Sequence, residues 1–353
     1  MKWTPLTALF TLCALALAAA AQEMELGPLP AGPAAPNLAR VELGELLFFD
    51  KRLGGDATIS CADCHDPDRA WTDGLALSKG YPGSLYFRNT PSLANVANRK
   101  WLYWDGRLPG NDLPTMVRDH LSEAHFMQAD GRLLIERMRQ VPEYERRFRD
   151  ASGGEPSYGR ILDAVSAFVT TLVSTDVPFD RYLRGEENAL DESATRGLAL
   201  FRGKARCANC HNGPMLTSES FVALGTPTNA DIFATPERHI TFRRFTKTLG
   251  VSAYASLRED PGRESVTQND KDRGGFRVPS LWEVGRTAPY MHDGGLATLA
   301  DVVGFYDAKW DLGLAPDEKN DLMAFLDSLS SPAPPPYARP KVPDYQLRKL
   351  GEN

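Results

Sequence analysis

The chain has 353 residues, a formal net charge of −6 at neutral pH, 42% hydrophobic residues and 24% charged residues. This length allows two ordinary domains or one large one, and the composition is typical of a soluble globular protein. The acidic balance argues against a nucleic-acid partner, because such partners select concentrated positive charge. Beyond its first residues, the chain has no stretch that is apolar for long enough to span a membrane.

Residues 1–21 have the pattern of a signal peptide. Lys2 precedes an apolar stretch from Leu6 to Ala18, and alanines at 19–21 provide the small residues that a signal peptidase requires. A retained membrane anchor is the alternative, but the apolar core is short and ends in alanines. We therefore expect an exported, periplasmic protein with no membrane span after cleavage.

Four cysteines follow the signal peptide as two pairs with the same spacing, each directly followed by a histidine. The motifs are Cys61-Ala-Asp-Cys64-His65 and Cys207-Ala-Asn-Cys210-His211. Thiols at this spacing can bond to the two vinyl groups of one haem, whose iron the adjacent histidine then binds. Disulfides are the default for an exported protein, a zinc site would leave each histidine unexplained, and a redox dithiol would need a βαβ context. The sequence therefore predicts two covalently bound haem c groups.

A short repeat precedes the two haem motifs, with Gly44-Glu-Leu-Leu-Phe48 before the first and Gly197-Leu-Ala-Leu-Phe201 before the second. Each copy is typical of a helix that runs into a haem-binding turn, although a match this short can also arise by chance. The stretch 150–159 is rich in Gly, Pro and Ser and indicates a connection between lobes. Apolar residues at helical spacing flank it, and strand signals are few.

These features predict a mainly α fold, with two cytochrome c-like haem lobes packed together, long irregular loops and little sheet. We expect the N-terminal lobe to span residues 22–155 and the C-terminal lobe residues 156–331. The proline-rich tail, 332–353, is expected to wrap the surface or to stay mobile.

Five further stretches, together with the haem motifs, resemble the bacterial di-haem cytochrome c peroxidase and MauG family. They are Gly44–Asp50, Arg88–Leu93, Trp104–Arg107, Phe276–Leu281 and Thr287–Gly294, in the order that the family has them. The resemblance implies that the haem on His65 reacts with hydrogen peroxide and that the haem on His211 transfers electrons.

The resemblance also indicates whether the iron on His65 has a second protein ligand. Family peroxidases that need reductive activation close this iron with a second histidine, in a loop where this chain has Tyr81. No histidine lies between His65 and His120. We therefore expect a permanently open iron, which favours the MauG-like branch, unless a Met or His from farther away closes it.

The second iron takes its other ligand, by resemblance, fourteen residues after the histidine of the Pro-Tyr-Met-His-Asp-Gly motif. Counting from His292 reaches Tyr306, where the peroxidases have Met and MauG has Tyr. A tyrosine on the apolar face of a helix ordinarily only packs. As a ligand, a phenolate donates strongly to iron and stabilises high oxidation states.

Trp104 matches the family's tryptophan between the two haems and is expected to relay electrons, although an aromatic in this cluster can also simply pack. Asn89, Thr287 and Pro289 match the family's calcium site, and hard oxygen ligands suit this ion. An Asn before Thr-Pro is also an ordinary turn residue.

The chain departs from the family above the first haem. Met116 and Phe126 stand where members have Gln and Glu, and His120 and His125 lie in the same stretch. Splitting peroxide needs a group that removes one proton and delivers it to the leaving oxygen. We hypothesise that His120 or His125 takes this role; the alternative is that both are surface histidines.

Three functions follow, in order of preference. The first is a MauG-like oxidase that uses hydrogen peroxide to oxidise a residue on a partner protein. The second is a peroxidase that takes electrons from a small cytochrome or cupredoxin. The third is a di-haem electron carrier, which would not react with peroxide.

Overall fold

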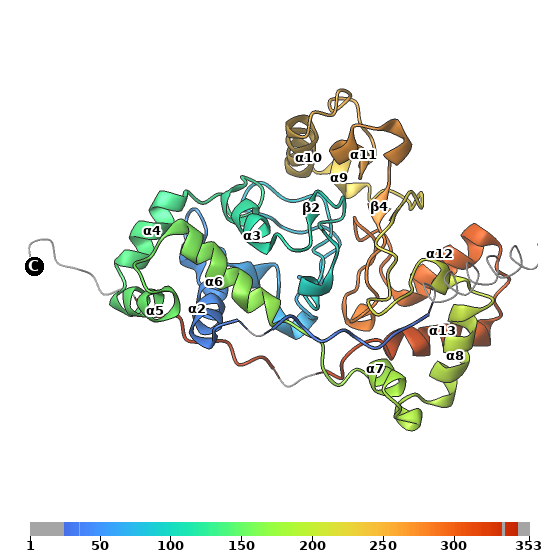
Figure 1. Ribbon diagram of the computed structural model, residues 1–353. Coiled ribbons are helices and arrows are strands. Elements are labelled where there is room, and N and C mark those ends of the chain that lie inside the picture. The colour runs from blue at the N-terminus through green and yellow to red at the C-terminus, as the bar shows by residue number, and fades with distance from the viewer. Residues whose placement is uncertain (1–24, 35, 334–335, 345–353) are drawn as a thin grey trace, which may run out of the picture.

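The computed structural model describes residues 25–34, 36–333 and 336–344, so the predicted signal peptide lies outside the described residues. The chain forms two helical lobes side by side, with a small helical subdomain above their junction (Figure 1). This arrangement confirms the predicted fold class. Within the described ranges, no helix is both long and apolar enough to cross a membrane.

The N-terminal lobe contains α2 (Leu38–Phe49), α3 (Leu113–Ser122), α4 (Gly131–Arg139), α5 (Pro142–Ser152) and α6 (Tyr158–Thr170). The C-terminal lobe contains α7 (Pro178–Leu183), α8 (Glu192–Arg202), α12 (Leu299–Trp310) and α13 (Pro316–Asp327). The subdomain contains α9 (Asp231–Ala234), α10 (Pro236–Thr248) and α11 (Glu264–Thr267). The strands of the described residues form two separate antiparallel sheets, β1 (Trp101–Leu102) with β2 (Leu108–Pro109) and β3 (Phe221–Val222) with β4 (Phe276–Arg277).

The repeat seen in the sequence is a repeat of helix crossings. A Cβ atom on Gly44 would overlap the carbonyl group of Ala164, where α2 crosses α6. A Cβ atom on Gly197 would likewise overlap the backbone carbonyl group of Asp321, where α8 crosses α13. In each pair an aromatic edge contact follows, between Phe48 and Phe168 at 5.2 Å and between Phe201 and Phe325 at 5.0 Å. The two lobes therefore share one packing scheme, in which glycine lets the helix backbones touch.

Replacing Gly44 or Gly197 by Ala is expected to destabilise the protein by about 1–3 kcal/mol or more, because the backbones must separate. Gly159 in α6 and Gly304 in α12 are matched controls, since nothing lies within 4 Å of a Cβ atom at either position. Alanine at these controls should stabilise by about 0.5–1 kcal/mol through helix propensity. Urea unfolding of the four variants measures the difference; equal effects at all four sites would contradict it.

The predicted lobe boundary at 155–156 is wrong, because α6 belongs to the N-terminal core. Ile161, Val165 and Phe168 are buried there together with the residues of α2. The C-terminal core begins along the chain at Val177, apart from two residues near the N-terminus. The Gly-, Pro- and Ser-rich stretch connects two helices inside one lobe, and the lobes divide after α6.

The two ends of the described chain cross over to the opposite lobe. Leu26 and Leu29 are buried in the core of the C-terminal lobe. The tail runs back along the N-terminal lobe (Figure 1), where Tyr337 stacks on Phe49 with 5.7 Å between ring centres and donates a 2.5 Å hydrogen bond to Glu45. The proline-rich tail thus wraps the surface over residues 336–344, and each arm ties the lobes together.

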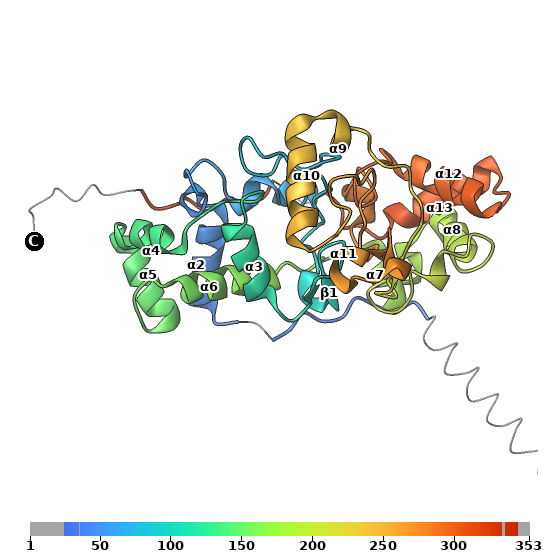
Figure 2. The same ribbon diagram turned by 90° about the horizontal axis from the view of Figure 1, so that it is seen from above.

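A third core, which the sequence did not suggest, joins the subdomain to a loop of the N-terminal lobe. Ile232, Phe242 and Phe245 pack against Leu77 and Phe87. Seen from above, α10 crosses the region between the lobes (Figure 2). The subdomain therefore covers the loop that carries the Arg88–Leu93 motif.

Candidate active site

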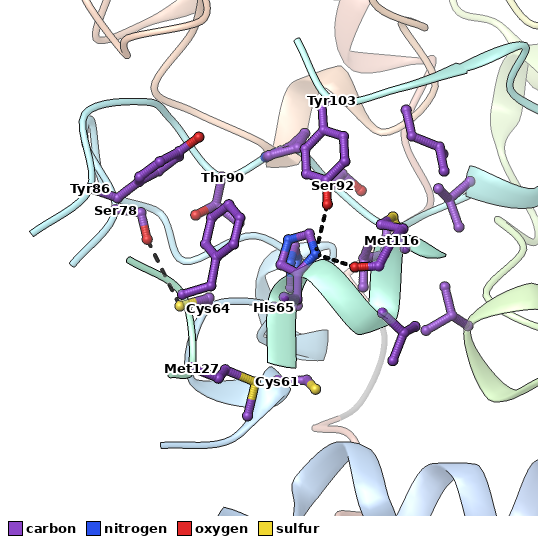
Figure 3. Close-up of a pocket in the computed structure, with 18 of the residues that line it drawn as sticks. Cys61, Cys64, His65, Ser78, Tyr86, Thr90, Ser92, Tyr103, Met116 and Met127 are labelled. Atoms are coloured by element: carbon purple, nitrogen blue, oxygen red, sulfur yellow. Dashed lines mark hydrogen bonds between the residues drawn. The ribbon is translucent and has the colours of Figure 1, made fainter. Parts of the chain in front are cut away.

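The first haem motif forms a tight turn after α2 at the edge of a cavity (Figure 3). Residues 61–63 make a single 3-10 turn, which Ser60 and Asp63 close by two 2.7 Å hydrogen bonds. Burial raises the pKa of Cys61 to about 12 and that of Cys64 to about 11. Both thiols line the cavity, and all four cysteines in the described part of the chain are free of disulfides.

His65 follows this turn and is oriented by a backbone group. Its Nδ1 atom lies 2.9 Å from the carbonyl oxygen of Trp71. A carbonyl can only accept, so Nδ1 carries the proton and Nε2 keeps a lone pair. Burial lowers the pKa of His65, so the imidazole is neutral, which is the form that binds a metal.

The second motif has the same construction. Cys207, Cys210 and His211 line a second cavity, and Nδ1 of His211 lies 3.2 Å from the carbonyl oxygen of Leu216. Burial lowers the pKa of His211 to about 4. This imidazole is therefore also neutral, with its lone pair on Nε2.

Both cavities fit haem c by their donor sets. Each has two free, half-buried thiols for the covalent bonds, one oriented neutral imidazole for the iron, and a largely apolar wall. Apolar residues on the wall of the first cavity include Phe48, Ile59, Leu93, Val96, Val117, Leu121, Val165 and Val169. When bound, haem iron supplies an atom that can take up peroxide and exchange electrons.

Trp104 lies between the two sites, since its side chain lines both cavities. Its Nε1 atom donates a 3.0 Å hydrogen bond to the carbonyl oxygen of Asn89. Arg99, which the sequence did not single out, also lines both cavities. Burial, and then the charge of Arg277, lowers the pKa of Arg99 to about 9. The wall between the cavities therefore holds an oxidisable indole and a half-buried cation.

Tyr306 lines the second cavity together with His211. It lies on α12, which begins at a capping box formed by Thr298 and Asp301. Burial, with the nearby Cys207 and Cys210 thiols, raises the pKa of the Tyr306 phenol. Its ring stacks on that of Trp310 at 4.9 Å. The position agrees with a role as ligand.

His120 lies in the first cavity, and His125 does not. His120 lines the cavity beside Met116 and Phe126, the residues at the family's Gln and Glu positions. His125 lies behind Phe126, where its ring stacks on Tyr86 at 5.2 Å. Its Nε2 atom is 3.0 Å from the Glu123 carboxylate, but without the angle of a hydrogen bond. Neither histidine is an exposed surface residue.

Tyr81 also stays outside the residues that line the first cavity. Burial raises the pKa of the Tyr81 phenol, and the nearby Asp56 raises it further. Tyr81, at the position of the closing histidine in family peroxidases, is therefore not among the residues around the predicted haem site.

The residues predicted to bind calcium border the same cavity. Asn89, Thr287 and Pro289 all line the second cavity. The Asn89 side-chain nitrogen donates a 2.8 Å hydrogen bond to the carbonyl oxygen of Leu75. The amide oxygen of Asn89 is therefore the atom that would bind a cation. Within the described residues, no cluster of three His, Cys, Asp or Glu could hold a metal, but the expected site does not use such residues. Calcium binding stays a prediction.

The motif residues Arg88, Asp105 and Arg107 form a buried ion-pair network that the sequence did not reveal. Arg88 binds Asp260 of the subdomain through two nitrogens, at 2.7 and 2.9 Å, and Asp105 through a third at 2.6 Å. Arg107 pairs with Asp105 at 3.0 Å. Two cations balance two carboxylates, so the network locks the subdomain onto the N-terminal lobe without net buried charge.

Comparison with known proteins gives a consistent result. A family model for di-haem cytochrome c peroxidase matches residues 38–188. The cytochrome-c peroxidase IdrP2 of Pseudomonas sp. is 42% identical over 355 residues, with 99% of this chain and 96% of the relative covered. The methylamine utilization protein MauG of Methylorubrum extorquens is 34% identical, with 89% and 83% covered. The crystal structure of a MauG-like protein associated with microbial copper homeostasis superposes with a TM-score of 0.72 at 29% identity, covering 86% of this chain and 93% of that chain. The chain belongs to the di-haem cytochrome c peroxidase and MauG family, whose members are haem oxidoreductases.

Proposed function

We propose that the protein is an exported peroxidase that reduces hydrogen peroxide at the His65 site, with electrons that a partner protein delivers through the His211 site. The observation that carries the proposal is the pair of CxxCH cavities with Trp104 in their shared wall. Relatives at 42% identity are named cytochrome-c peroxidases, which puts this function ahead of partner oxidation. In balanced form, one H2O2, two electrons and two protons give two molecules of water.

His120 is the proton-handling group in this proposal. Its Nδ1 atom lies 2.8 Å from the carbonyl oxygen of Met116, so the lone pair is on Nε2. Burial lowers the pKa of His120 to about 3, so it is a neutral base near pH 7. Met116 and Phe126 cannot accept a proton. His125, the other histidine of this stretch, serves as packing behind the cavity.

The peroxidase test is consumption of hydrogen peroxide by the purified di-haem protein, with a reduced small cytochrome c or a reduced cupredoxin as donor. We expect two donor molecules to be oxidised for each peroxide consumed. Peroxide that disappears without donor oxidation, or no consumption before or after partial reduction, would contradict the proposal. The latter result would leave the electron carrier.

Electron transfer between the sites is expected to slow in Trp104→Phe, because phenylalanine is much harder to oxidise than an indole. Stopped-flow spectra after one equivalent of peroxide should show an early change at the first haem and a delayed change at the second. Trp101→Phe is the matched control, since Trp101 is a half-buried tryptophan nearby that lines neither cavity. Equal rates in the two variants would remove Trp104 from the path.

A MauG-like oxidation of a residue on a partner protein is the second candidate, and Tyr306 is the observation that favours it. A Tyr306 ligand would stabilise oxidised iron at the second site and so hold oxidising equivalents for a slow protein substrate. Under this alternative, peroxide without donor would produce a long-lived oxidised protein, and Tyr306→Met would shorten its lifetime. Rapid decay in both proteins would exclude it. A calcium ion at Asn89, Thr287 and Pro289 remains part of either proposal.

A further inference from the structure

His120 and His65 both line the first cavity, at a spacing that suits a metal ion between them. Their ring centres are 6.4 Å apart, with an angle of 60° between the ring planes. We propose that in the resting protein His120 binds the iron of the first haem on the face opposite His65. The inference rests on the haem of the proposed function and adds a sixth ligand to it.

The distance between the two ring centres distinguishes direct binding of His120 to the iron from a position farther from it. Two imidazoles on opposite faces of one metal ion have centres about 6 Å apart, because each metal–nitrogen bond is about 2 Å and each centre lies about 1 Å behind its nitrogen. An imidazole that reaches iron-bound peroxide through a hydrogen bond would lie about 3 Å farther away. The observed 6.4 Å matches the first arrangement.

The orientation of His120 is that of the two motif histidines. Its Nδ1 atom points to the carbonyl oxygen of Met116 at 2.8 Å, with the hydroxyl of Tyr103 at 3.2 Å. His65 and His211 point Nδ1 to carbonyl oxygens in the same way, at 2.9 and 3.2 Å. Such a bond fixes the tautomer and makes Nε2 the metal-binding atom. Figure 3 shows Tyr103 and Met116 with their dashed bonds, close to His65.

Packing holds the His120 ring in this position. It lies between the rings of Tyr103 and Phe126, at 5.4 and 4.4 Å and nearly parallel to both. Phenylalanine at the family's Glu position therefore supports the imidazole. In this proposal a histidine of α3 takes the place of the histidine missing from the Tyr81 loop. When it is not bound to the iron, Nε2 of His120 would be the base.

The test is the spin state of the fully ferric di-haem protein, measured by electron paramagnetic resonance and visible spectra. We expect His120→Ala and His120→Phe each to gain one high-spin haem per molecule relative to the natural protein. Phenylalanine fills the same place between the two rings, which guards against misfolding. Met116→Leu and Met127→Leu test the thioethers that also line the cavity, and His125→Ala is the matched histidine control; all three should keep the natural spectrum.

No gain of high-spin haem in either His120 variant would overturn the ligation, as would an equal gain in a methionine variant. Neither result depends on turnover. Donor-dependent peroxide consumption is measured separately, so a protein can fail one test and pass the other.

Discussion

Peroxide turnover with saturating reduced donor is expected to fall by about 10²–10⁴-fold in His120→Ala, the usual contribution of a general acid–base group. The residues at the family's acid–base positions, Met116 and Phe126, cannot transfer protons, and both line the cavity beside His120. The variant therefore has an open iron but no base to take the proton from peroxide. Steady-state rates of donor oxidation measure the loss.

His125→Ala is the control for this prediction. His125 lies five residues farther along the chain and is also largely buried, but it packs on Tyr86 outside the cavity. Its removal should change turnover far less than the loss of His120. A His120→Ala enzyme that turns over as fast as the natural one, or faster, would mean that His120 only blocks the iron and that another group handles the proton.

Replacing Arg88 by Met is expected to lower the free energy of unfolding by about 3–5 kcal/mol, because it leaves the buried carboxylate of Asp260 uncompensated. The Arg88 side chain is only 2% exposed, and those of Asp260 and Asp105 are 1% and 0% exposed. Asp105 keeps its bond to Arg107, whereas Asp260 loses both of its bonds to Arg88. Urea unfolding measures the loss, and Asp260→Asn in the Arg88→Met background should restore part of it.

Exposed ion pairs provide the control for Arg88→Met, and the pH dependence provides a second test. Arg139→Met removes ion pairs to Glu136 and Glu155 whose side chains are all at least 44% exposed, and should cost no more than about 1 kcal/mol. Burial raises the pKa of Asp260, but Arg88 outweighs it and the net shift is downward. A carboxylate whose pKa is lower in the folded protein stabilises the fold above its unfolded pKa, and this stabilisation is lost as the pH falls. The loss of stability in Arg88→Met should therefore be full at pH 7 and shrink below about pH 4. A pH-independent effect would point to packing alone.

The sequence by itself predicted the mainly helical class, the two-lobe repeat, and the thiols and histidines that line the two cavities. These follow from local chemistry, because two thiols and a histidine must lie within five residues to hold one haem. The helical pattern of apolar residues likewise depends on positions close together in the sequence. The resemblance to the family also pointed to Trp104 and Tyr306, and both line the expected cavities. Loop composition misplaced the lobe boundary, because a polar stretch marks a turn without saying which core the next helix joins.

Only the tertiary structure decided which histidine faces His65. The sequence predicted an open iron from the Tyr81 loop, and it could not rank His120 above His125. The choice depends on the rotation of α3 and on the rings of Tyr103 and Phe126, which fix one imidazole in the cavity and leave the other behind it. The Arg88–Asp260 pair spans 172 residues and was invisible for the same reason. Contacts between distant segments arise from packing geometry, which no local pattern encodes.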